Sequence, residues 1–128
     1  MNKKLLIAGS ILGLISIVLG AFASHGLGKV ITEDAINTFQ VGVRYQMYHA
    51  LMLLFVGSTT KIKVKSKQWI FLLVVLGIFL FSGSIYGLAT NDLTGFDFKA
   101  IGFITPIGGL LLILCWLVML VDFLKLKE

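Results

Sequence analysis

Four long apolar runs, separated by three short polar breaks, organise the whole chain. They extend over residues 5–23, 41–59, 69–90 and 100–121. A helix needs about 20 apolar residues to cross the hydrocarbon core of a bilayer, and each run meets or approaches that length. The pattern therefore predicts an all-α integral membrane protein with a single transmembrane domain over residues 1–128, folded as an up-down four-helix bundle.

The composition agrees with a membrane protein rather than a soluble one. Hydrophobic residues make up 58% of the chain and its mean hydropathy is +1.00, whereas soluble domains average about 45–50% apolar residues. A net charge of +5 can indicate nucleic-acid binding, but here the lysines flank the apolar runs. This placement favours a role in membrane topology, and no nucleic-acid partner is expected. The single cysteine, Cys115, lies inside the fourth run, so no intramolecular disulfide can form.

The distribution of lysines predicts how the chain is oriented. Eight lysines lie before the first run, between the second and third runs, or after the fourth, and only Lys29 and Lys99 lie in the other two breaks. Short loops rich in basic residues stay in the cytoplasm, so both termini are expected to be cytoplasmic. Trp69 is expected to anchor the third run at the interface. Four lysines in the middle break are expected to contact the anionic inner leaflet: Lys61, Lys63, Lys65 and Lys67.

The first run carries a stripe of small residues. At about 100° per residue, one side of its helix presents small side chains, and these predict close helix packing in lipid: Gly9, Gly13, Ser16, Gly20 and Ser24. A cleavable signal peptide is the alternative, since a basic start at residues 1–4 precedes an apolar stretch and a small-x-small site at residues 21–23. A discarded leader has no use for a packing face, so the run is expected to be retained.

The second run is unusual because its outer half is polar. Thr32 is a predicted N-cap followed by two acidic residues, so the helix is expected to begin before the membrane. Arginine at the centre of a spanning helix costs about 2.5–3.5 kcal/mol on insertion scales. Arg44 can avoid this cost by extending to the outer headgroups, but Gln46 and His49 lie deeper and need partners.

The other runs place polar, small or helix-breaking residues at the same outer depth. The coincidence predicts one polar pocket that opens toward the outer leaflet, lined by His25, Arg44, Tyr45, Gln46, Tyr48, His49, Ser84, Tyr86 and Thr105. Pro106 is expected to kink the fourth helix, because proline leaves the carbonyl of Gly102 without its helical partner.

Four motifs carry a resemblance to a known family. They are GAFASHGL at residues 20–27, YQMYHAL at 45–51, SGSIY at 82–86 and ITPIGG at 104–109. In this order they resemble the motifs of the small membrane protein family catalogued as domain of unknown function 423. The family's usual first motif reads GAFGAHGL, so Ala23 and Ser24 depart from it at two small positions. The resemblance implies a four-helix, multi-pass protein of a bacterial plasma membrane, and it implies no established activity.

Catalysis and metal or haem binding are not expected. The serines near His49 lack the spacing of a catalytic triad, and no carboxylate lies within a run. His25 lies at the membrane edge and His49 about 12 Å deeper, so one haem iron bridges them only if the segment after Ser24 folds inward. Two histidines without cysteine or carboxylate neighbours also make a poor zinc site. The chain is therefore expected to be no enzyme and to hold no cofactor.

Two functions remain, and membrane lipids are expected partners in both. In the first, the polar outer half binds or conducts a lipid headgroup or small anion, with Arg44 as its countercharge. In the second, the polar groups hold the helices together, and the protein organises the membrane or binds a partner, either its own copy or another membrane protein. The second is preferred, because 128 residues without a detectable inverted repeat leave little room for a transporter.

Overall fold

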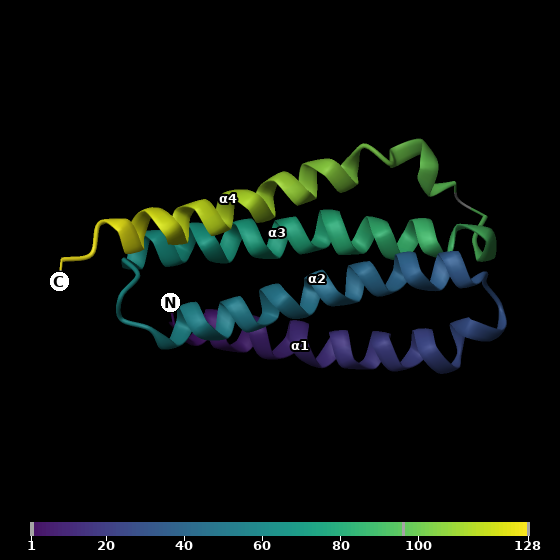
Figure 1. Ribbon diagram of the computed structural model, residues 1–128, viewed down its shortest axis with the longest axis horizontal. Helices are drawn as coiled ribbons and strands as arrows, with labels where there is room; N and C mark the ends of the chain where they lie inside the picture. The colour runs from purple at the N-terminus through teal and green to yellow at the C-terminus, as the bar shows by residue number, and fades with distance from the viewer. Residues whose placement is uncertain (1, 96, 128) are drawn as a thin grey trace.

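Four long α-helices dominate the computed structural model, which describes residues 2–95 and 97–127. They are α1 (Asn2–His25), α2 (Glu33–Ser58), α3 (Val64–Ala89) and α4 (Ile104–Leu124). Short 3₁₀ turns lie in the connections at Leu27–Lys29, Asn91–Leu93 and Phe98–Ile101, and these described residues contain no strand. Consecutive helices run antiparallel, so α1 begins and α4 ends at the same end of the molecule (Figure 1). The all-helical class predicted from the sequence is confirmed.

The helices do not coincide with the apolar runs. α2 begins at Glu33 and α3 at Val64, ahead of the runs at 41–59 and 69–90, whereas α4 begins only at Ile104. Thr32 is the N-cap of α2, as predicted, and its hydroxyl accepts a hydrogen bond from the Ala35 amide at 3.1 Å. Local capping thus decides where a helix starts, whereas hydropathy marks only the part that suits lipid.

The predicted kink at Pro106 is wrong. Because α4 begins at Ile104, Pro106 lies in its first turn, where a backbone N–H would have no helical partner in any case. Gly102 lies outside the helix, and its carbonyl accepts a hydrogen bond from the Thr105 amide at 3.4 Å. The proline therefore starts the helix instead of bending it.

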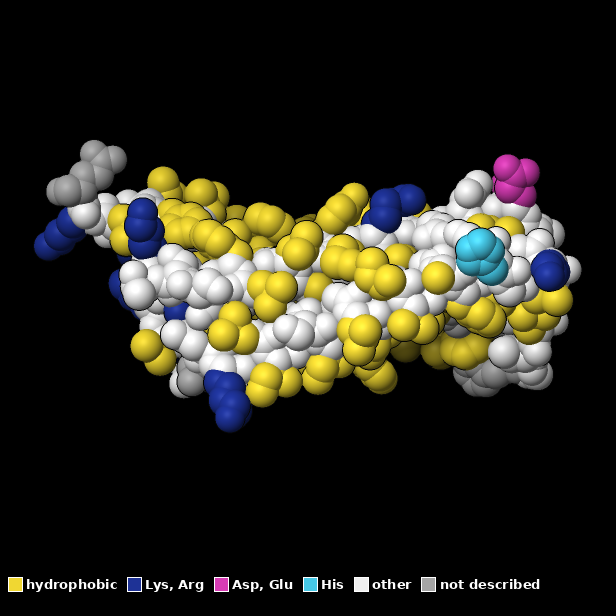
Figure 2. Space-filling view, turned by 90° about the horizontal axis from the view of Figure 1, so that it is seen from below, with side chains coloured by type: hydrophobic (Ala, Val, Ile, Leu, Met, Phe, Trp, Pro, Cys, Tyr) yellow, Lys and Arg dark blue, Asp and Glu magenta, His cyan; other side chains and the backbone are white. Residues whose placement is uncertain are grey.

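Three of the described helical segments are long and apolar enough to cross a membrane. They are Asn2–Lys29, Val64–Ala89 and Ile104–Leu124. Segment α2 is not among them, because the polar residues between Arg44 and His49 lower its hydropathy. Figure 2 shows hydrophobic side chains over the middle of the molecule and charged side chains gathered mainly toward its two ends.

The principal helix interfaces follow the chain order. Helix α1 packs on α2, α2 on α3 and α3 on α4, whereas α1 and α4 share no comparable interface within the described residues. These two helices lie at opposite edges of the molecule (Figure 1). The arrangement is therefore more open than a ring of four mutually packed neighbours, and lipid, which is as apolar as the helices, gives no hydrophobic force to close it.

Glycines make the closest helix contacts. A Cβ atom on Gly9 of α1 would come within 2.8 Å of the carbonyl oxygen of Ala50, and one on Gly108 of α4 would overlap the backbone of α3 at Leu80 and Phe81. In the predicted stripe on α1, Gly9 and Ser16 are buried, while Gly13 and Gly20 are half-buried beside α2. Ser24 is exposed, so the expected packing face ends before it.

Candidate functional site

Gln46 joins three helices near the middle of the molecule. Its side chain is only 3% exposed, and its Nε2 donates a hydrogen bond to the backbone carbonyl of Leu12 in α1 at 2.9 Å. The Tyr86 hydroxyl of α3 donates to Gln46 Oε1 at 2.7 Å. Ser16 donates to the same Leu12 carbonyl at 2.8 Å. Both ends of the Gln46 amide are thus occupied by protein groups, and the contacts tie α1, α2 and α3 together.

His49 is held in the same way between α2 and α4. The indole N–H of Trp116 donates to His49 Nε2 at 3.1 Å, and His49 Nδ1 lies 2.7 Å from the carbonyl oxygen of Tyr45. An indole N–H can only donate, so Nε2 accepts and Nδ1 carries the ring proton that bonds the Tyr45 carbonyl. Both ring nitrogens therefore have hydrogen-bond partners within the protein.

Two hydroxyl contacts complete the links of α3 with its neighbours. The buried Ser82 hydroxyl donates to the Gly42 carbonyl of α2 at 2.8 Å, and the Ser84 and Thr105 hydroxyls bond to each other between α3 and α4. Gly42 also makes room for Tyr86, since a Cβ there would lie 2.6 Å from the tyrosine ring. Among the described residues, every buried side-chain nitrogen or oxygen has a hydrogen-bond partner.

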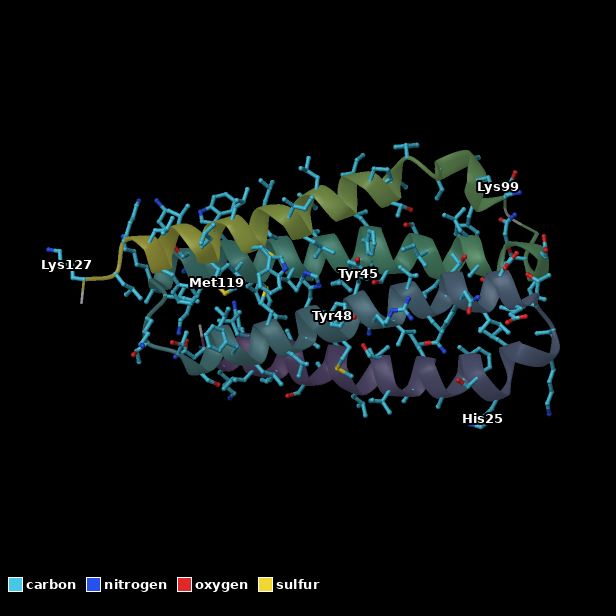
Figure 3. The ribbon with its side chains drawn as sticks, in the orientation of Figure 1. His25, Tyr45, Tyr48, Lys99, Met119 and Lys127 are labelled. Carbon is cyan, nitrogen blue, oxygen red and sulfur yellow. The ribbon has the colours of Figure 1, made fainter. Side chains whose placement is uncertain are left out.

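The remaining predicted pocket residues lie on the surface. Arg44 and Tyr48 are exposed and border a groove of about 440 Å³ between α1 and α2. The described residues that line this groove include no acidic side chain. Tyr45 is 40% exposed and packs its ring on Phe81 with centroids 5.1 Å apart. His25 is exposed at the edge of α1 and directed away from the other helices (Figure 3).

The nine residues therefore do not line one pocket. They divide into two buried hydrogen-bonded groups around Gln46 and His49, a hydroxyl pair, a surface groove beside Arg44 and the separate His25. The sequence placed most of these residues at one depth, but residues at one depth on different helices point in different directions around each helix axis. Trp116 and Ser82 complete the network and were not in the predicted set.

A second polar cluster lies at the lysine-rich end. Asp122 of α4 accepts hydrogen bonds from the Lys63 amide at 2.9 Å and from the Ser66 hydroxyl at 2.8 Å, and so caps the start of α3. The Lys67 ammonium group bonds the Thr59 carbonyl and, at 2.8 Å, Asn2 Oδ1. Lys67 is only 4% exposed. The expected headgroup contact therefore does not fit Lys67, whereas Lys61, Lys63 and Lys65 are exposed.

Sequence reasoning missed this cluster, although it had one signal. Asp122 is the only acidic residue at the inner end of the fourth run. A carboxylate next to lipid needs hydrogen-bond donors, and the Lys63 amide and the Ser66 hydroxyl at the start of the neighbouring helix supply them. In this part of the structure, as in the rest of the described chain, no group of three or more His, Cys, Asp or Glu side chains is placed to hold a metal ion.

Comparison with known proteins identifies the family. Residues 19–109, which contain all four motifs, match the family described as "Protein of unknown function (DUF423)". The UPF0382 membrane protein SH2409 of Staphylococcus haemolyticus is 37% identical over 126 residues, covering 96% of this chain and 97% of the relative. The UPF0382 membrane protein YwdK of Bacillus subtilis is 36% identical over 128 residues, covering 96% and 98%.

A third relative comes from Escherichia coli. The UPF0382 inner membrane protein YgdD of Escherichia coli K12 is 34% identical over 130 residues, covering 99% of this chain and 94% of the relative. No solved structure matches the chain. The resemblance seen in the motifs is confirmed, and the chain belongs to this family of bacterial membrane proteins of unknown function.

Proposed function

We propose that the protein is a membrane scaffold whose own hydrogen bonds hold its helices in place and whose apolar faces pack against another transmembrane helix. The observation that carries this proposal is that Gln46 bonds two neighbouring helices: its amide donates to the Leu12 carbonyl of α1 and accepts from the Tyr86 hydroxyl of α3. Hydrogen bonds between helices in lipid are worth roughly 0.6 kcal/mol each, so several of them suit a structural role.

The scaffold requires all four helices to cross the membrane. Helix α2 has 26 residues, about 39 Å of helix, and packs between α1 and α3. Its deep polar side chains, Gln46 and His49, are paired with protein groups, which offsets the cost of placing them in lipid. With eight lysines at one end, the positive-inside rule then gives an up-down bundle with both termini in the cytoplasm.

The face that suits a partner helix is the groove between α1 and α3. It has a volume of about 560 Å³ and exposes Gly83, at which an added Cβ would meet no atom within 4 Å. Small residues facing lipid allow a second helix to approach closely. The lining follows α3 from residue 71 to residue 86, about 22 Å of helix, which is long enough to contact several turns of a partner.

Site-specific photo-crosslinking in native membranes tests the scaffold. A photoreactive residue at Val75, inside the groove, is expected to yield one discrete protein adduct, and Leu110, exposed on α4 outside the groove, serves as the matched control. Gly83→Leu should abolish the Val75 adduct by filling the groove. Equal adducts at both positions, or an adduct that survives Gly83→Leu, would contradict the proposal.

A second candidate function is the binding of a lipid headgroup or small anion at Arg44. The supporting observation is that Arg44 is exposed while no acidic residue lines its groove among the residues described. An arginine near lipid needs a countercharge, and a phosphate group supplies one. The test measures the binding of phosphatidylglycerol and of inorganic phosphate by Arg44→Gln, with Lys29→Gln at the same end as the control. Equal binding by the two variants would rule out Arg44 as the anion site.

A further inference from the structure

A groove between α3 and α4 at the lysine-rich end combines an apolar floor with a basic mouth. Its volume is about 630 Å³. Six hydrophobic side chains from the two helices line its length: Trp69, Leu73, Leu114, Leu117, Val118 and Val121. Lys63, Lys65 and Lys125 surround its mouth, together with Ser66 and Asp122. An apolar groove alone would suit any hydrocarbon, but three cations at one end favour an amphiphile with an anionic head.

The three lysines are available for such a head. Lys63, Lys65 and Lys125 are exposed. Asp122 is the acidic residue at the mouth, but its two oxygens already accept hydrogen bonds from the Lys63 amide and the Ser66 hydroxyl. The mouth therefore keeps a net positive charge of two, from three lysines and one carboxylate.

We propose that this groove is a binding site for an anionic glycerophospholipid. Lys63, Lys65 and Lys125 bind its phosphate, and one acyl chain lies along the apolar floor. The apolar floor extends over residues 114–121 of α4, about 10 Å of helix, which lies within one leaflet of a hydrocarbon core about 30 Å thick. Trp69 lines the groove and is half exposed, the interfacial position at which tryptophan rings are common.

Native mass spectrometry tests the site. The full chain is placed in bilayers of equimolar phosphatidylglycerol and phosphatidylcholine, extracted gently, and scored for the fraction that retains one phosphatidylglycerol. The test variant changes Lys63, Lys65 and Lys125 to Gln. The matched control changes Lys3, Lys4 and Lys61 to Gln, which removes the same charge from exposed positions at the same end.

The groove variant should lose retention by more than about ten-fold, since each direct hydrogen bond from a lysine ammonium group to the lipid phosphate contributes a gain of about ten-fold or more. The control should lose less than about two-fold, because its lysines attract lipid only through the general surface charge. Equal losses in the two variants, or equal retention of phosphatidylcholine by the wild type, would overturn the proposal.

A second variant separates the acyl-chain contact from the charge. Leu117→Trp fills the apolar floor and leaves all lysines in place, so it should also lose phosphatidylglycerol. Leu110→Trp, on an exposed part of α4 outside the groove, should not. Full retention by Leu117→Trp would show that the lipid does not enter the groove and would refute the site as proposed.

Discussion

Trp116 of α4 and His49 of α2 are joined by a hydrogen bond of 3.1 Å from the indole N–H to the imidazole Nε2. The rings meet nearly edge-on, with an angle of 80° between their planes. The bond links two helices that are not neighbours in the chain. It also sets the tautomer of His49, because the ring proton must then lie on Nδ1, beside the Tyr45 carbonyl.

The first prediction concerns this tautomer. Nitrogen-15 NMR of the protein in bilayers should show His49 protonated at Nδ1 and unprotonated at Nε2. Trp116→Phe removes the donor, so the chemical shift of His49 Nε2 should change, while the chemical shifts of the exposed His25 ring should stay unchanged. A wild-type His49 ring protonated at Nε2 would refute the interhelical bond.

The second prediction concerns the contact of α4 with α3. Gly108→Ala places a Cβ against the backbone of Leu80 and Phe81, whereas Gly109→Ala places one 3.6 Å from the Phe81 side chain, an ordinary contact. Gly108→Ala should therefore lower the free energy of unfolding by about 1–3 kcal/mol, and Gly109→Ala by less than about 0.5 kcal/mol. Unfolding in mixed detergent micelles measures both, and equal values would argue against the close backbone contact.

The third prediction ranks the small residues of α1. A Cβ on Gly9 would lie 2.8 Å from the Ala50 carbonyl oxygen, but one on Gly13 would lie 3.8 Å from the Ala50 methyl group. Gly9→Ala should therefore destabilise the helix pair by about 1–3 kcal/mol, while Gly13→Ala should be nearly neutral. Thermal unfolding of the two variants compares them, and the reverse order of stability would show that α1 packs on α2 in a different register.

The fourth prediction concerns orientation. With Cys115 replaced by Ala, single cysteines at Lys61 and Asp92, both exposed in loops at opposite ends, report the two sides of the membrane. An impermeant thiol reagent should label position 92 in intact cells and position 61 only after the cells are opened. Labelling of position 61 in intact cells would contradict this orientation and would indicate the opposite one.

The sequence predicted the helical class, the number of long helices and the N-cap at Thr32, because these depend on hydropathy and on neighbouring residues. The sequence also predicted one polar pocket, whereas the structure has several separate polar groups. Gln46 faces α1 and α3, His49 reaches Trp116 of α4, and Arg44 faces outward. The apolar runs indicate how deep a residue lies along its helix. The direction in which its side chain points depends on which helices pack together.

The lysine-rich end was misread for a related reason. Lys67 was expected at the membrane surface with its neighbours, but its ammonium group bonds Asn2 at the start of α1. Asp122 likewise caps a helix that begins nearly sixty residues earlier in the chain. A pattern of nearby charges does not reveal such distant partners, and only the folded arrangement brings them into contact.

The most direct test of the scaffold is a double-mutant cycle on Gln46 and Tyr86. Gln46→Leu, Tyr86→Phe and the double variant are unfolded in mixed micelles, and their free energies of unfolding are compared with that of the wild type. Tyr86 of α3 donates a hydrogen bond to Gln46 of α2, so each single variant removes the same bond. The double variant should therefore lose less free energy of unfolding than the sum of the two single variants, by a coupling energy of about 0.6–1.7 kcal/mol. Strictly additive losses would contradict the account, since they would mean that Gln46 and Tyr86 do not hold the helices together.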